Sequence, residues 1–246
     1  MSTGIWMAAS GASSQITALD ATANNLANAN TVGYKADQAV FQEHLIQAMY
    51  VGKAQREMRY NGVAAVATDM RGGPLMVTNK PLDVSIEDSE GFFAVRTPSG
   101  ERYTRAGAFQ VGADGTLVTA QGFPVLDAGG STINVQPDAK TMSIGDDGTL
   151  TVDDSEVGQL KVVKFRQLNG LEKDGAQLFR ATQRSGQAEV VQASVQAGTL
   201  ELPNVSIVKG MTDLVSATRA FETLERAVET FSQLEHRAAT DIVGAR

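Results

Sequence analysis

Proline is confined to the middle of this chain, and this distribution restricts the fold more than any other feature. All six prolines lie between residues 74 and 203. A proline inside a helix removes a backbone hydrogen bond and collides with the preceding turn, so a long helix needs a stretch without one. Long helices are therefore expected only at the two ends, with shorter elements between them.

Apolar residues near the start recur at alternating spacings of four and three, the pattern of a helix with a heptad seam. The seam positions are Ile5, Ala9, Ala12, Ile16, Leu19, Ala23 and Leu26. Residues 207 to 234 repeat the pattern, with Ile207, Leu214, Phe221 and Val228 on one line and Ala217, Leu224 and Phe231 on a companion line. Neither seam has a partner nearby in sequence, so we expect the two terminal helices to pair in a coiled-coil-like way.

The surfaces opposite the two seams differ in charge. The second helix carries mixed charges, typical of a solvated face, at Arg219, Glu222, Glu225, Arg226 and Glu229. The first 34 residues carry a single charge, Asp20, although 20% of the chain is charged. This uncharged surface favours a first helix covered by other subunits; burial inside its own domain is the alternative. Gly4 and Gly11 each cost that helix about 1 kcal/mol relative to alanine, so it should be marginal alone.

The middle of the chain contains short runs rich in Val, Ile, Thr and Phe, separated by turn signals, as is typical of an all-β region. The expected strands are 82–86, 92–97, 109–111, 116–119, 132–135, 149–152, 160–165 and 178–181. Residues 112–117 and 145–150 nearly repeat, and each has Asp-Gly at its centre. We therefore expect two similar hairpins whose turns need residues that tolerate positive φ.

Residues 35 to 79 are ambiguous. Val40, Phe41, Leu45, Met49 and Tyr50 have the spacing of a short amphipathic helix, whereas residues 56–73 show little pattern and are expected to be extended or loop. The expected fold class is α+β. Residues 1–34 with 200–246 would form a terminal helical domain, residues 35–79 a connecting segment, and residues 80–199 a central, mainly antiparallel β domain.

Composition excludes several classes of protein. A net charge of −7 argues against a nucleic-acid-binding protein and against binding to an anionic membrane surface. The sequence has no stretch of 18 apolar residues, so no membrane-spanning helix is predicted. Residues 1–9 lack the positive charge and the apolar run of a secretory signal peptide. Without cysteine, neither a disulfide nor a thiolate metal site can form.

Candidate chemistry is sparse, so we expect no catalytic site, no metal site and no cofactor. His44 and His236, both in predicted helices, have no thiol or serine elbow beside them, and two histidines alone rarely bind a metal. Residues 146–148, Asp-Asp-Gly, lack the other ligands of a calcium loop and are predicted to be a turn. A glycan-cleaving enzyme stays an alternative, because such enzymes use a pair of carboxylates. Three residues could supply that pair: Asp83, Glu87 and Asp88.

Three ordered parts of the chain resemble one known family. Residues 21–35, Ala-Thr-Ala-Asn-Asn-Leu-Ala-Asn-Ala-Asn-Thr-Val-Gly-Tyr-Lys, closely resemble the N-terminal signature of flagellar rod and hook proteins. Residues 81–86, 91–95 and 103–109 look like the β domain that rod proteins share. Residues 198–201, 204–205, 211–212 and 218–222 resemble the C-terminal signature.

The resemblance implies structural roles for particular residues. Asn24, Asn25 and Asn28 offer side-chain amides where a helix meets other backbones, and Gly33 allows the turn out of the helix. Pro203 stands where the family usually has serine, so capping of the second helix is expected to pass to Asn204 or Ser206. The seam residues would then pack helices and subunits together.

The resemblance implies a structural subunit of the flagellar rod, a drive shaft that transmits torque from motor to hook, and not an enzyme. It implies polymerisation through the terminal helices, with copies of itself, other rod proteins and the flagellar type III export apparatus as partners. The location would be the basal-body rod that spans the periplasm, reached without a cleaved signal peptide. The short β region and residues 218–222 are most like a rod subunit of the proximal kind. The distal kind is the alternative, and a surface adhesin, which would need a conventional export signal, is a more distant one.

Overall fold

The computed structural model describes residues 3–47, 57–136, 139 and 141–244, and the chain divides into two compact units. The helical unit comprises Met1–Ala27, Asp37–Ala67 and Ser206–Arg246. The β unit comprises Asn28–Ala36 and Thr68–Val205. The domain boundaries expected near residues 34, 79 and 199 stay a prediction, because compact packing does not test independent folding.

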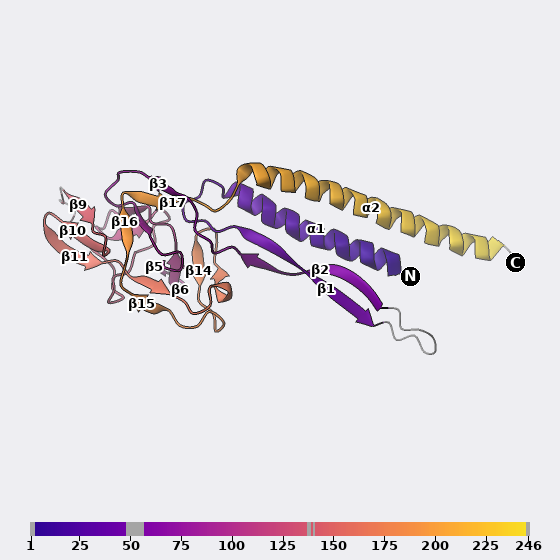
Figure 1. The fold of residues 1–246 in the computed structure, drawn as a ribbon, viewed down its shortest axis with the longest axis horizontal. Coiled ribbons are helices and arrows are strands. Elements are labelled where there is room, and N and C mark those ends of the chain that lie inside the picture. The colour runs from indigo at the N-terminus through magenta and orange to yellow at the C-terminus, as the bar shows by residue number, and fades with distance from the viewer. Residues whose placement is uncertain (1–2, 48–56, 137–138, 140, 245–246) are drawn as a thin grey trace. The chain divides into compact units, whose positions relative to one another are not determined.

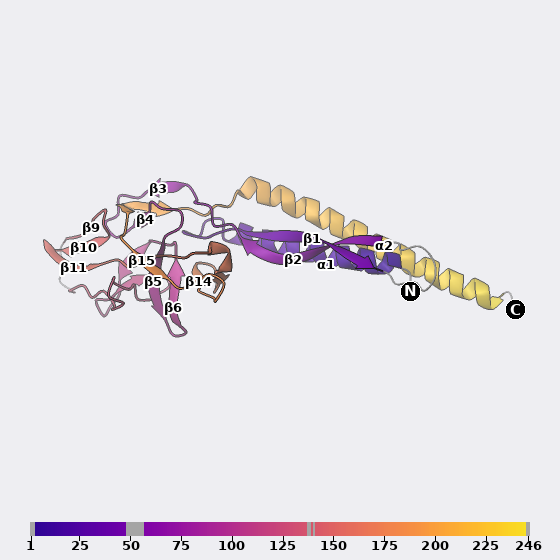
Figure 2. The ribbon, with the colours of Figure 1, turned by 60° about the horizontal axis from the view of Figure 1, so that its bottom comes forward.

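Two long helices dominate the helical unit and lie side by side in both ribbon views (Figures 1 and 2). Helix α1 spans Thr3–Ala27 and α2 spans Ile207–Gly244. Both occupy the proline-free ends, so long terminal helices are confirmed. Ser206 caps α2, because its hydroxyl accepts the Lys209 backbone N–H at 3.4 Å. This is one of the two capping residues that the sequence predicts.

A two-stranded sheet accompanies α1 in the same unit (Figure 2). It consists of β1 (Asp37–Gln47) and β2 (Glu57–Thr68). The prediction of a short helix around Val40 and Leu45 is therefore wrong, and His44 lies in a strand; Met49 and Tyr50 lie outside the described residues. Periodicity over so short a stretch cannot separate helix from strand, and pairing with β2 decides the outcome.

Among its described residues, the β unit contains fifteen short strands and one 3-10 turn, η1 (Leu168–Gly170). The strands are β3 (Leu75–Val77), β4 (Val84–Ile86), β5 (Phe92–Thr97), β6 (Gly100–Thr104), β7 (Phe109–Val111), β8 (Leu117–Thr119), β9 (Met142–Ile144), β10 (Thr149–Val152), β11 (Ser155–Gln159), β12 (Val162–Lys164), β13 (Glu172–Lys173), β14 (Leu178–Arg180), β15 (Glu189–Val191), β16 (Val195–Ala197) and β17 (Thr199–Glu201).

These strands form one six-stranded sheet in the order β13-β14-β6-β5-β12-β15 and one three-stranded sheet in the order β11-β10-β9. Three further sheets are strand pairs, β16-β4, β17-β3 and β7-β8. The strand pairings described for the β unit are antiparallel, so the predicted mainly antiparallel β region between two helices is confirmed. Residues 132–135, expected to be a strand, make only isolated bridges to Leu126 and Thr116.

Strand β5 lies between two hydrophobic clusters. Phe93 and Val95 pack into the larger cluster with Leu117, whereas Phe92 and Ala94 pack into the smaller one. A strand covered on both faces has a continuous apolar run instead of an alternating pattern. The run Phe-Phe-Ala-Val in the sequence is therefore explained by two-sided burial.

The two predicted Asp-Gly turns have the same hydrogen bonds. In the first, Asp114 accepts the Thr116 backbone N–H at 3.1 Å and Gly115 adopts φ +80°. In the second, Asp147 accepts the Thr149 backbone N–H at 3.0 Å and Gly148 adopts φ +78°. These bonds lower the pKa of both carboxyl groups. The prediction that both turns need positive φ is confirmed.

Candidate functional site: the helix pair and a buried charge cluster

The two terminal helices run antiparallel, as two close approaches at different positions along α1 show. A Cβ placed on Gly11 would lie 3.4 Å from the Leu224 Cδ1 atom. A Cβ placed on Gly210 would lie 3.9 Å from the Leu26 Cδ1 atom. Residues late in α1 thus face residues early in α2. The glycines let a leucine of the other helix approach the backbone.

The predicted seam residues lie at different depths in this pair. Half-buried positions are Ile5, Leu19, Leu26, Leu214, Phe221, Leu224 and Val228. Exposed positions are Ile16, Ile207 and Phe231. Contacts within one chain do not reveal subunit packing, so the role of these residues between subunits stays a prediction.

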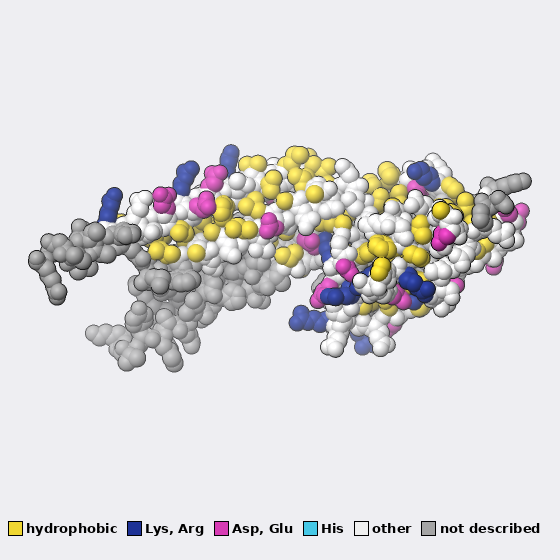
Figure 3. Space-filling model, turned by 180° about the vertical axis from the view of Figure 1, so that it is seen from behind, with side chains coloured by type: hydrophobic (Ala, Val, Ile, Leu, Met, Phe, Trp, Pro, Cys, Tyr) yellow, Lys and Arg dark blue, Asp and Glu magenta, His cyan; other side chains and the backbone are white. Residues whose placement is uncertain are grey.

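The outer face of α2 changes character along its length. Val208, Met211 and Val215, spaced by three and four, are exposed and form what we call the α2 apolar stripe. Farther along, the charged residues from Arg219 to Glu229 are exposed, as the sequence predicts for a solvated face. Figure 3 shows yellow apolar surface over the first turns of α2 and projecting charged side chains beyond it. The apolar stripe is the part of this face that water solvates poorly.

Asn25 joins α1 to the start of β1 within the helical unit. Its side-chain oxygen accepts the Asp37 backbone N–H at 2.8 Å, and its amide donates to the Asp37 carbonyl at 2.7 Å. An amide that meets another backbone is the role that the sequence predicts for the asparagines here. Asn28 is half-buried and its side chain accepts the Thr31 hydroxyl, while Asn24 is exposed.

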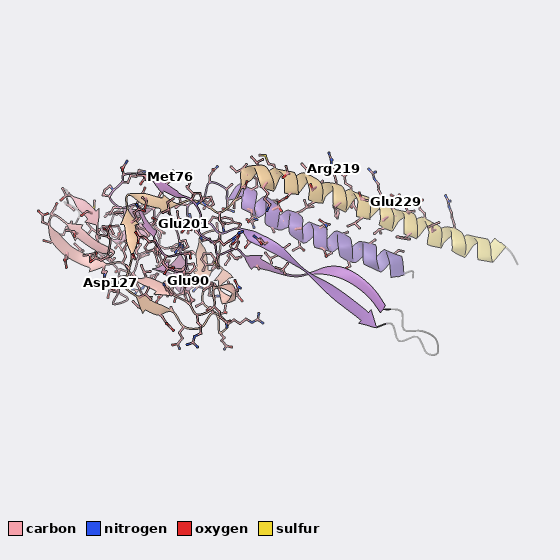
Figure 4. The ribbon with its side chains drawn as sticks, viewed as in Figure 1. Met76, Glu90, Asp127, Glu201, Arg219 and Glu229 are labelled. Atoms are coloured by element: carbon pink, nitrogen blue, oxygen red, sulfur yellow. The ribbon has the colours of Figure 1, made fainter. Side chains whose placement is uncertain are left out.

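A buried charge cluster, consisting of Lys35, Arg105 and Glu201, lies in the β unit; Figure 4 labels Glu201. One carboxylate oxygen of Glu201 accepts the Lys35 ammonium at 2.7 Å, and the other accepts the Arg105 Nε at 2.8 Å. The Gly73 backbone N–H donates to the same carboxylate at 2.9 Å. Buried charges need partners of this kind, because an isolated ion is costly to remove from water. We call this group the Glu201 cluster.

Burial and neighbouring charges shift the pKa values of Glu201 and Lys35. Burial would raise the pKa of Glu201, but the positive charges of Arg105 and Lys35 outweigh it and hold that pKa below its ordinary value of 4.5. Burial lowers the pKa of Lys35 below 10.5, because it disfavours the charged form more than Glu201 favours it. Two cations share one carboxylate, so backbone carbonyl groups accept hydrogen bonds from the N–H groups of Lys35 and Arg105 that do not reach Glu201. Lys35 donates to the Arg71 carbonyl at 2.8 Å, and Arg105 donates to the Asp88 carbonyl at 2.7 Å.

Further hydrogen bonds hold the same segments together beside the cluster. The Ala36 backbone N–H donates to the Asn204 side chain at 2.7 Å, and the Asn204 amide donates to the Asp69 carbonyl at 2.8 Å. The Gly33 backbone N–H donates to the Glu201 carbonyl at 2.8 Å. Residues just after α1, just after β2 and just before α2 are thus fixed at one place in the β unit.

Gly33 lies in the series of turns that follows the end of α1 at Ala27. Gly33 adopts φ +70°, and a Cβ there would lie 2.4 Å from the Ala106 backbone nitrogen. Only glycine fits this combination of positive φ and close backbone approach.

The sequence did not reveal the Glu201 cluster, although a signal was present. Each of its members lies inside one of the three segments that resemble the rod and hook family. Charged residues that interrupt apolar segments of a β region are candidates for buried pairs. Their pairing could not be inferred, because Lys35 and Glu201 are 166 residues apart.

Two of the three carboxylates considered for catalysis have structural contacts, whereas one side-chain oxygen of the third, Asp83, is buried without a hydrogen-bond partner. Glu87 accepts the Ser194 hydroxyl at 2.7 Å, and Asp88 pairs with Lys164. In the described part of the chain, no group of three or more His, Cys, Asp or Glu side chains is placed to hold a metal ion. None of the helices there is long and apolar enough to cross a membrane.

Comparisons with known proteins give one consistent result. Family models match residues 5–35 (flagella basal body rod protein), residues 88–152 (flagellar hook protein FlgE/F/G D1 domain) and residues 196–240 (flagellar basal body rod FlgEFG protein C-terminal). The chain is 33% identical over 226 residues to the flagellar basal-body rod protein FlgF of Caulobacter vibrioides, covering 92% of this chain and 91% of that protein. It is 32% identical over 240 residues to FlgG of Bacillus subtilis, covering 89% and 90%. It is 34% identical over 254 residues to FlgG of Agrobacterium fabrum, covering 93% and 95%.

Proposed function

Because this chain belongs to the flagellar basal-body rod proteins, a family of structural components and not of enzymes, we propose that it polymerises through its terminal helices and transmits torque from motor to hook. Its place is the flagellar basal body. The glycan-cleaving alternative is set aside, since the family has no such activity.

The observation that carries this proposal is the α2 apolar stripe. Val208, Met211 and Val215 are exposed although α2 is already paired with α1. Covering what is still exposed of these three side chains would contribute on the order of 3–5 kcal/mol in total. A helix of the next subunit is a suitable cover, because residues three and four apart on α2 form a ridge that fits a helical groove.

Contacts of this kind explain how a small subunit could form a shaft. A stripe that meets a different surface on the next copy makes a heterologous contact, which propagates as an open helix instead of closing. Tightly packed helices resist twist, since packed protein interiors have low compressibility. Torque would then pass from subunit to subunit through the packed helices.

Within the rod we propose a position of the proximal kind, as for relatives named FlgF. Similar relatives carry both names, FlgF and FlgG, so the distal kind is the alternative. Copies of itself and other rod proteins would be the partners. Export through the flagellar type III apparatus and a location in the periplasm-spanning part of the rod belong to the same proposal.

The proposal is tested by a charge placed in the stripe. Met211→Glu should remove the chain from purified basal bodies and abolish swimming, because an unpaired carboxylate would be buried between subunits. Thr223→Glu is the matched control, since Thr223 is exposed on the same helix beyond the stripe. Normal incorporation of the Met211→Glu chain would refute assembly through this face. Images of basal bodies with a tagged chain would show whether it lies toward the motor or toward the hook.

A further inference from the structure

Strand β3 presents an unusual surface for the edge of a sheet. Its three residues are all apolar and all exposed, with 50% of Leu75, 41% of Met76 and 66% of Val77 accessible to solvent. Its partner β17 is buried along its whole length. Figure 4 labels Met76 on β3 at the border of the β unit. Edges of this type are templates for pairing with another strand unless charge or a bulge protects them.

The backbone of β3 is free on its outer side. Strand β3 pairs with β17 so that Met76 faces Leu200. The Leu202 N–H donates to the Pro74 carbonyl and the Thr78 N–H donates to the Gly198 carbonyl. In this pairing every second residue of β3 (74, 76 and 78) forms backbone hydrogen bonds with β17. The N–H and C=O groups of Leu75 and Val77 therefore point away from β17. In the described chain no strand pairs with that side of β3.

Strand β15 is the complementary edge of the six-stranded sheet. The Ala94 N–H donates to the Lys161 carbonyl, so residues 161 and 163 bond to β5, and residues 162 and 164 bond to β15. Val190 faces Val163, which leaves the N–H and C=O groups of Val190 pointing outward. Its side chain is also 53% exposed. Strand β15 thus has an apolar residue and unpaired backbone groups at the same position.

Two other edges of the β unit, β13 and β11, carry protective features. Strand β13 consists of Glu172 and Lys173, and Glu172 pairs with Arg180. Strand β11 exposes Val157, but it carries an exposed glutamate next to that valine and a register irregularity against β10. Charge and bulges are two ways in which proteins blunt an edge. Strand β3 has neither feature, and β15 has no register irregularity against β12, although the exposed Glu189 lies next to Val190.

We propose that β3 of one copy of this chain pairs with β15 of the next copy, forming a second subunit contact in addition to that of the helices. The two strands lie well apart on the β unit in both ribbon views (Figures 1 and 2). One copy can therefore use both edges at once, and a contact between unlike edges propagates. Two three-residue edges bury far less than the roughly 1,000 Å² of a stable interface, so the contact forms only when the helices also assemble.

The test uses the absence of cysteine from the chain. Two double variants cover the two antiparallel registers that bond Val190 to β3: Leu75→Cys with Val190→Cys, and Val77→Cys with Val190→Cys. Each chain replaces the native copy in flagellated cells, and basal bodies are purified under mild oxidation. One of the two should give disulfide-linked dimers and longer ladders, because each copy carries both halves of the contact. The single variants should give none.

The control pair, Val77→Cys with Val157→Cys, probes β11 as the competing edge. The proposal is overturned if the chain is present in basal bodies and neither Val190 pair cross-links. Dimers from the Val77→Cys single variant, or cross-links only with Val157→Cys, would overturn it as well. It rests on the proposed function, whose failure is seen separately as absence of the unmodified chain from basal bodies.

A second measurement covers cysteine variants that fail to incorporate. Val190→Lys places a charge on the edge and leaves the bonds of β15 to β12 in place. It should lower swimming and the amount of chain in basal bodies, whereas Val157→Lys should leave both unchanged. Equal behaviour of these two variants would overturn the proposal.

Discussion

Replacing Glu201 by glutamine is the sharpest perturbation of the β unit. The side chain keeps its volume, but Lys35 and Arg105 lose the one carboxylate that balances them, with both cations almost fully buried. Removing one partner of a buried pair typically costs about 3–5 kcal/mol, because an uncompensated charge remains inside. For a domain of this size such a loss lowers the melting temperature by roughly 6–20 °C.

The assay is differential scanning calorimetry of the purified chain, with circular dichroism to verify the fold. Glu172→Gln is the matched control, because it breaks an ion pair with Arg180 that is largely exposed, at 56% and 58% for the two side chains. An exposed pair is screened by water and contributes little to stability, so its loss should hardly change the melting temperature. If Glu201→Gln and Glu172→Gln lowered the melting temperature equally, the argument for a buried charge cluster would be refuted.

The remaining predictions concern acid stability, a glycine and the free monomer. The pKa of Glu201 is lower in the folded chain than in the unfolded one, so its stabilisation is complete above the ordinary value of 4.5 and is lost as the pH falls through the lowered pKa. The stability gap between the unmodified chain and Glu201→Gln, measured by urea unfolding, should therefore shrink in acid; a constant gap would contradict this. Gly33→Ala should destabilise by about 1–3 kcal/mol more than Gly122→Ala, because both glycines have positive φ but only Gly33 meets backbone within 3 Å; equal melting temperatures would contradict the close approach. Hydrogen exchange on dilute monomer should show weak protection over residues 3–28 and strong protection over β5, and strong protection of Ile16 to Leu26 would mean that α1 is stable without neighbours.

Much of the β unit followed from local signals in the sequence. The predicted strands 92–97, 109–111 and 149–152 match β5, β7 and β10 residue for residue. All three are next to glycine-containing turns, so a strand and its boundary are encoded in the same few residues. Strands such as β6 and β11 were missed. They are rich in Gly, Glu and other residues that form strands only because a neighbour pairs with them.

The helical unit was predicted in part, for a similar reason. Heptad spacing and the absence of proline indicate both helices, since these signals extend over many turns. Strand β1 was missed because its apolar residues fit helical spacing equally well over ten residues, whereas β2 lies where an extended segment or loop was expected. The Glu201 cluster depends on residues from three distant segments. No local pattern contains that information.

The composition of the Glu201 cluster suggests why charge is used at this point. The chain crosses from one unit to the other after residues 27, 36, 67 and 205. The hydrogen bonds beside the cluster involve Ala36, Asp69 and Asn204, and each of these residues lies within two residues of a crossing. Apolar packing of equal volume is often as stabilising as a buried ion pair, or more so. It does not fix register, because an apolar contact can slide along a segment at little cost. Hydrogen bonds to the Ala36 backbone N–H at 2.7 Å and to the Arg71 carbonyl at 2.8 Å do fix the register. The cluster and its neighbours thus hold the β-unit segments beside residues 36, 69 and 204 in one register, which apolar packing alone would not do.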